Sequence, residues 1–140
     1  MSDTFAASNT PHFLGSEIEQ SAPGNAAIHV LPVPYEKTVS YGGGTRNGPS
    51  AILDASWQLE TWDGQSSPCE RGIHTCAPVD CSGAADGVIA GIAAATAQIL
   101  RHGAFPVVLG GEHTVTGGVL EGFRDAGFDD FGIVQIDAHA

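Results

Sequence analysis

Short apolar runs alternate with segments of helical periodicity along most of this chain, and this alternation restricts the folds that it can adopt. The apolar runs cover residues 26–33, 72–79, 105–109 and 131–136, and the helical segments cover 49–59, 84–102 and 112–126. Strands that are apolar throughout and separated by helices are typical of a parallel sheet covered on both faces. We therefore expect an α/β fold with a mostly parallel sheet, in which 105–136 forms one right-handed strand–helix–strand crossover.

The length of the chain, 140 residues, fits one ordinary domain. Residues 1–25 are rich in Ser, Thr, Pro and Gly and lack periodicity, so we expect a flexible amino-terminal arm before a domain over 26–140. No apolar stretch reaches the roughly 18 residues that a membrane span needs. The first residues lack the basic and apolar regions of a signal peptide. A cytoplasmic protein with no membrane partner is the resulting expectation.

The charge balance limits the kinds of partner. The net charge is -11 and only five residues are basic. Because phosphate binding needs clustered Lys and Arg, we expect no nucleic-acid partner. A metal ion or a small cationic substrate suits the acidic surface better, although the acidity could also serve solubility alone.

The three cysteines, Cys69, Cys76 and Cys81, indicate no metal or disulfide framework. Their number is odd, and their spacings fit neither a CxxC motif nor a zinc finger. In a reducing compartment we expect free thiols, and we assign them no chemistry.

Polar side chains follow two of the predicted strands at the edge where ligands collect in parallel α/β sheets. His113 follows the strand at 105–109, and Asp137 and His139 follow the strand at 131–136. Side chains alternate along a strand, so Asp137 and His139 point to the same side. A His at a helix start is more often exposed or capping than a ligand. Two imidazoles and a carboxylate on consecutive strands, however, indicate a metal site.

These residues lie in two segments, GGEHT at 110–114 and DAHA at 137–140, that resemble signature segments of the ureohydrolase family of arginases and agmatinases. A third segment, at 31–56, resembles the beginning of the bacterial and archaeal agmatinase branch and reads LPVPYEKTVSYGGGTRNGPSAILDAS. The resemblance implies a three-layer α/β/α domain with a mostly parallel sheet. It also implies that the glycine-rich loop at 40–49 shapes the cleft or subunit contacts. Nucleotide binding is not indicated there, because the loop matches neither a P-loop nor a dinucleotide fingerprint.

The same resemblance implies roles for the site residues. His113 is similar to the family histidine that binds one Mn²⁺, Asp137 to the carboxylate between two Mn²⁺ ions, and His139 to a ligand of the second ion. A further Asp ligand of the family falls at position 141, one residue past Ala140. The second Asp pair and the catalytic His of the family lie beyond that. We therefore expect the amino-terminal part of a larger domain, inactive alone, with its catalytic residues outside these 140 residues.

The function that follows is binuclear manganese hydrolysis of a guanidino group to urea and an amine, with agmatine converted to putrescine as the first expectation. Other ureohydrolases, namely arginase, guanidinobutyrase and formiminoglutamase, remain alternatives because the residues that separate them lie mainly elsewhere. The resemblance further implies a homo-oligomer, a trimer or hexamer, of the whole protein. A non-catalytic α/β metal-binding domain is the alternative of a different class.

Overall fold

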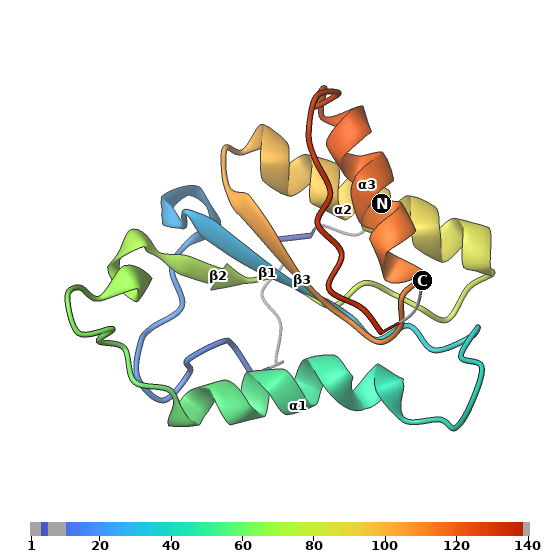
Figure 1. The fold of residues 1–140 in the computed structure, drawn as a ribbon. Coiled ribbons are helices and arrows are strands. Elements are labelled where there is room, and N and C mark those ends of the chain that lie inside the picture. Colours follow the sequence, from blue (N-terminus) through green and yellow to red (C-terminus); the bar gives the residue numbers. More distant parts are fainter. Residues whose placement is uncertain (1–3, 6–10, 139–140) are drawn as a thin grey trace.

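The computed structural model describes residues 4–5 and 11–138, and a parallel sheet lies at its centre (Figure 1). Its strands are β1 (Ile28–Val33), β2 (Ile73–Thr75) and β3 (Phe105–Gly110), in the order β2-β1-β3. Both neighbours of β1 run parallel to it. The predicted parallel sheet is confirmed, and the carboxyl ends of its strands share one edge.

Helices cover both faces of this sheet, which gives three layers (Figure 1). Helix α1 (Gly48–Ala55) lies on one face, while α2 (Ala85–Arg101) and α3 (Val115–Asp125) lie together on the other. Short 3-10 turns complete the secondary structure, at Pro23–Asn25, Thr45–Asn47, Ser56–Gln58 and Pro68–Arg71. The predicted α/β/α class is therefore confirmed. Among the described helices, none is long and apolar enough to cross a membrane.

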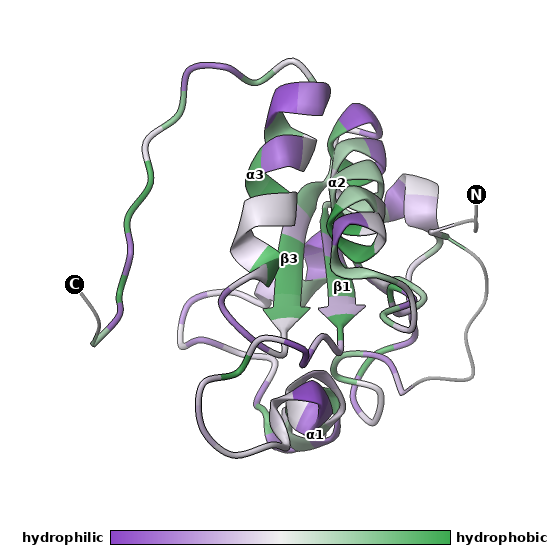
Figure 2. Ribbon diagram, turned by 90° about the vertical axis from the view of Figure 1, so that its right-hand side faces the viewer, coloured by the Kyte–Doolittle hydropathy of each residue, from purple (hydrophilic) through white to green (hydrophobic). Residues whose placement is uncertain are grey.

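Alternate side chains of β1 enter two apolar cores, as the pleat of a strand requires. Leu31 and Val33 pack on the side of α2, with Ile92 among their neighbours. Val30 packs on the side of α1 with Leu53. Figure 2 shows the strands β1 and β3, with hydrophobic stretches, between α1 and the pair formed by α2 and α3.

Helices α2 and α3 approach closely because glycines replace side chains at their contact. A Cβ at Gly118 would lie 2.8 Å from the Cβ of Ile92, and one at Gly122 would lie 2.6 Å from the Cβ of Thr96. Such separations are shorter than van der Waals contact allows. The position of α3, and with it the turn that leads into α3, is thus fixed against α2.

The strand predicted at 131–136 is wrong for this structure. Residues 128–137 form no strand or helix, and the side chains of Val134 and Ile136 are 89% and 98% exposed. An apolar segment becomes a strand only when its backbone groups pair with a neighbour. Here β3, the strand that comes before it in the chain, is an edge strand of the sheet, but the segment runs apart from β3 in Figure 2. Its apolar side chains therefore remain exposed.

Part of the predicted arm is held against the domain. The backbone N–H of Phe13 donates to Thr75 Oγ1, and that of Leu14 donates to Ser56 Oγ, both at 2.9 Å. The side chain of Leu14 is buried in the core on the side of α1. A boundary of the domain at residue 25 stays a prediction.

Candidate metal centre

The turn after β3 carries the first predicted ligand, and a backbone contact fixes its path. The N–H of Gly111 donates to the carbonyl of Val33, the last residue of β1, at 3.1 Å. A Cβ at Gly111 would lie 2.1 Å from the carbonyl oxygen of Tyr35, so only glycine fits. Helix α3 begins at Val115 rather than at Glu112, because Glu112, His113 and Thr114 form the turn that enters it.

The structure brings His113 and Asp137 together, as their sequence positions predict. His113 Nδ1 lies 3.3 Å from Asp137 Oδ2, and the side chains are 77% and 11% exposed. The amide of Gln135 also donates to Asp137 Oδ2, at 3.0 Å. His139 lies outside the described residues. Among the residues that are described, no group of three or more His, Cys, Asp or Glu side chains is placed to hold a metal ion.

The donor types of this pair suit a hard divalent ion. Carboxylate oxygen and imidazole nitrogen are ligands that Mn²⁺ accepts, whereas thiolate would favour softer metals. The cysteines are free, as expected, and Cys76 lies buried in the core on the side of α2. Residues His113 and Asp137 therefore fit part of a manganese site by chemistry.

A carboxylate next to His113 joins the turn to the loop that follows β1. Glu112 Oε1 accepts hydrogen bonds from the backbone N–H groups of Lys37 and Thr38, each at 3.0 Å, and from Thr38 Oγ1, at 2.9 Å. Partial burial raises the pKa of Glu112, but these hydrogen bonds outweigh it and leave the pKa below its ordinary value. The loop after β1 is thus attached directly to the turn that carries His113.

A second carboxylate, Glu36, holds the glycine-rich loop in shape. Its Oε2 accepts hydrogen bonds from the N–H groups of Gly44 and Arg46, at 2.6 and 2.9 Å, and from the Thr45 hydroxyl, at 3.0 Å. The bond from Arg46, with those from Gly44 and Thr45, holds the pKa of the Glu36 carboxyl below its usual range. Gly44 takes a left-handed conformation (φ 118°), which glycine adopts without strain.

A cavity of about 470 Å³ opens beside His113. Its walls come from the loop after β1 and from the turn after β3, and the lining residues are Thr38, Val39, Ser40, Tyr41, Thr45, Gly110, Gly111, Glu112, His113 and Thr114. No Lys or Arg is among these described lining residues, and Glu112 contributes a carboxylate. The cavity is therefore suited to a cation rather than an anion.

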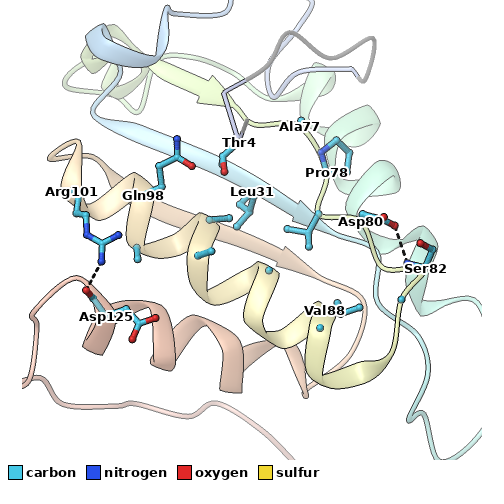
Figure 3. A pocket seen from close by; sticks show the side chains of 17 residues that line it. Thr4, Leu31, Ala77, Pro78, Asp80, Ser82, Val88, Gln98, Arg101 and Asp125 are labelled. Carbon is cyan, nitrogen blue, oxygen red and sulfur yellow. Dashed lines mark hydrogen bonds between the residues drawn. The ribbon is translucent and has the colours of Figure 1, made fainter. Parts of the chain in front are cut away.

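A larger cavity, of about 720 Å³, lies elsewhere, between α2 and the segment 77–83 (Figure 3). Small residues of α2, including Gly87, Gly91 and Ala94, line it. At one end Arg101 donates a hydrogen bond to the carbonyl of Asp125. No predicted metal ligand lines this cavity, so its size does not make it the functional site.

The sequence did not reveal the bonds between Glu112 and Thr38. Strands β1 and β3 are neighbours in space, although β2 lies between them in the sequence. Only the order of strands in the sheet shows which loops, at the ends of neighbouring strands, lie close together. A polar residue in the loop that follows a strand is the signal that the sequence offers, and it indicates His113 but does not single out Thr38.

The fold and the site together define a class of protein: a three-layer α/β domain with an imidazole–carboxylate pair at the carboxyl edge of a parallel sheet. Comparison with known proteins places it more narrowly. The chain belongs to the arginase family, whose pattern it matches over residues 26–140. The expected family is therefore confirmed.

Individual relatives agree with this assignment. The chain is 41% identical to N(1)-aminopropylagmatine ureohydrolase of Synechocystis sp. over 94% of its own length, and 40% identical to the protein of that name from Thermus thermophilus over 82%. It spans 45% and 40% of those relatives. Among solved structures, the agmatine ureohydrolase of Thermoplasma volcanium shares the fold, with a TM-score of 0.67 at 24% identity, over 73% of this chain and 36% of that one.

Proposed function

We propose that the complete protein is a ureohydrolase that releases urea from a linear guanidino compound with the help of two Mn²⁺ ions. The observation that carries this proposal is the approach of His113 to Asp137, 3.3 Å apart at the carboxyl edge of the sheet, in a chain of the arginase family. The chain spans less than half of its curated relatives, so the activity is proposed for the whole protein.

His113, Asp137 and His139 would hold the metal on this side of the site. Bound divalent ions lower the pKa of water and stabilise the charge that develops when it attacks a guanidinium carbon. The residues of this chain supply the rest of the local environment. Glu112 and Thr38 fix the turn beside His113, and the cavity there gives the substrate access.

The cavity supports a cationic substrate. No Lys or Arg is found among its described lining residues, and the chain carries a net charge of -11. The names of the relatives favour N(1)-aminopropylagmatine as the substrate to test first, with agmatine second. Both compounds present the guanidinium that the proposed reaction requires, and they differ in the amine chain attached to it.

Urea release by the complete protein tests this function. The protein is freed of metal with a chelator, loaded with Mn²⁺ and assayed separately with N(1)-aminopropylagmatine, agmatine, arginine and guanidinobutyrate. We expect urea from one of the first two, loss of it after chelation, and loss of it in His113→Ala. Mn²⁺ binding without urea from any of the four would instead favour a non-catalytic metal-binding domain.

We also propose that the complete protein is a homo-oligomer, a trimer or hexamer. The described residues leave large apolar side chains exposed, including Phe105, Ile133 and Ile136, which is consistent with coverage by further chain or by another subunit. Light scattering coupled to size exclusion measures the mass directly. A monomer at micromolar concentration would contradict the proposal.

A further inference from the structure

Thr38 contacts both sequence neighbours of His113. Its hydroxyl lies 2.9 Å from Glu112 Oε1 and 2.9 Å from Thr114 Oγ1. A carboxylate only accepts, so the single hydroxyl proton of Thr38 goes to Glu112 and the Thr114 hydroxyl must donate to Thr38. The direction of both bonds is thereby fixed. His113 sits in the backbone between two residues that are bonded to one side chain.

This arrangement matters because the side chain of His113 is 77% exposed. With so much of its surface in solvent, packing constrains the imidazole little, so its place depends on the backbone of residues 112–114 and on its contact with Asp137. That backbone is held on its helix side by turn bonds, in which the N–H of Val115 donates to the carbonyl of Glu112 and that of Thr116 donates to the carbonyl of His113. Thr38 holds the turn from the opposite side, through its N–H and hydroxyl.

Thr38 also begins the wall of the cavity beside His113. Val39, Ser40 and Tyr41, which directly follow Thr38, line that cavity together with His113. One residue therefore attaches the cavity wall to the turn that carries the candidate ligand.

We propose that Thr38 is a positioning residue. Its hydroxyl positions His113 for metal binding and holds the cavity wall at residues 39–41 next to His113. The part of this inference that concerns metal rests on the proposed function. Thr38 does not itself contact metal or substrate in this assignment. It acts through Glu112 and Thr114.

The experiment compares Thr38→Val, which keeps the shape and removes the hydroxyl, with Thr38→Ser, which keeps the hydroxyl. Ser66→Ala is the matched control, because the Ser66 hydroxyl also donates to a carboxylate, that of Asp63 at 3.2 Å, and lines neither cavity. In the complete protein, the Mn²⁺ dissociation constant is measured by titration calorimetry, and the melting temperature and steady-state kinetics are measured alongside.

We expect Thr38→Val to weaken Mn²⁺ binding about tenfold, the lower end of the loss seen when partners of metal ligands are removed. Thr38→Ser should restore most of the affinity, and Ser66→Ala should leave it unchanged. A merely structural role would instead lower the melting temperature of Thr38→Val while leaving the Mn²⁺ affinity of the folded protein intact. Unchanged affinity in Thr38→Val, or an equal loss in Ser66→Ala, overturns the proposal.

Hydrogen exchange separates this inference from the proposed function. Without metal, the amides of residues 112–116 should exchange faster in Thr38→Val than in the wild type and in Ser66→Ala. If the wild type releases no urea but the exchange and the Mn²⁺ affinity respond as stated, the proposed activity fails and the role of Thr38 stands. If the wild type is active and neither quantity responds, the role of Thr38 fails alone.

Discussion

His113 Nδ1 lies 3.3 Å from Asp137 Oδ2, which joins the turn before α3 to the far end of the segment that follows α3. Between these two residues the chain forms the whole of α3 and then turns back in the opposite direction (Figure 1). A second contact anchors the beginning of the returning segment, where the rings of Phe123 and Phe131 lie 5.4 Å apart. The pair therefore closes a loop around α3 and places two metal-binding side chain types at one point.

Removing either member of this pair should weaken metal binding. We expect Asp137→Asn and His113→Ala in the complete protein to raise the Mn²⁺ dissociation constant by at least about 100-fold, beyond the range for outer partners of ligands. Calorimetric titration measures it. Asp129→Asn is the control, because it removes an exposed carboxylate on the same segment. Equal affinity in Asp137→Asn and Asp129→Asn would exclude Asp137 as a ligand.

Gly111→Ala should destabilise the protein through a backbone collision. The new Cβ would lie 2.1 Å from the carbonyl oxygen of Tyr35, so the turn after β3 must move away from β1. We expect the free energy of unfolding to fall by about 3 kcal/mol or more, at the upper end of the cost of overpacking. Chemical denaturation measures this fall.

Gly117→Ala is the matched control for that change. Gly117 lies in α3, and a Cβ there would meet nothing within 4 Å. Alanine is the better helix former, so we expect the free energy of unfolding to rise by up to about 1 kcal/mol. Similar losses in both variants would show that the close approach at Gly111 has no energetic consequence.

The stability of the protein should fall on mild acidification because of His29. This side chain is fully buried, its Nε2 donates to the carbonyl of Pro23 at 3.0 Å, and its ring lies 5.2 Å from that of His74, its partner in the register of β1 and β2. Burial lowers the pKa of His29 below its ordinary value of 6.5. The Pro23 bond opposes this shift, while His74 and His102 add to it. Cys76 Sγ lies 3.8 Å from its Nδ1, and the ring of Phe5 lies 5.2 Å from its own ring.

The sign follows from proton binding in the two states. Below pH 6.5 the unfolded chain protonates its His29 before the folded protein does. The contribution of the neutral, buried His29 ring to the free energy of unfolding is thus fully present above pH 6.5. It is lost as the pH falls through the lowered pKa of His29. Denaturation of wild type and His29→Gln between pH 7.5 and 5.5 should give a flatter pH dependence for the variant. Carboxylates with lowered pKa values, such as Glu36, change the free energy of unfolding only at more acidic pH. Equal slopes in the two proteins would contradict this assignment.

The cysteines should differ in reactivity toward an alkylating reagent. Burial raises the pKa of Cys76 to about 12, and burial, aided by the charge of Asp80, also raises the pKa of Cys81. Because the thiolate is the reactive form, Cys76 should be labelled last at pH 8 in the native protein, after the half-buried Cys69 and Cys81. Mass spectrometry of the peptides gives the order. Labelling of Cys76 as fast as in denaturant would disagree with its burial.

Several features of the fold followed from local sequence. The apolar runs that became β1 and β3, and the periodic spacing of Val88, Ile92, Ala95 and Ile99 that became the buried face of α2, depend on residues close together in the chain. Gly103 follows that helix with a φ of 77°, the left-handed conformation in which glycine commonly ends a helix. The segment 131–136 was mispredicted because an apolar run indicates burial or pairing only when a partner strand is present.

What the sequence by itself determined was therefore the class of fold, the order of its elements as far as α3 and the residue types of the candidate site. Those properties come from backbone preference and side-chain periodicity over a few residues. The tertiary structure decided which strand ends meet: β1 lies beside β3, so Thr38 reaches Glu112 and Thr114 across a long separation in the chain. It also decided that His29 and His74 share one buried site. Such contacts depend on strand order, which is set by the packing of the whole sheet and its helices, and no local pattern of residues carries that information.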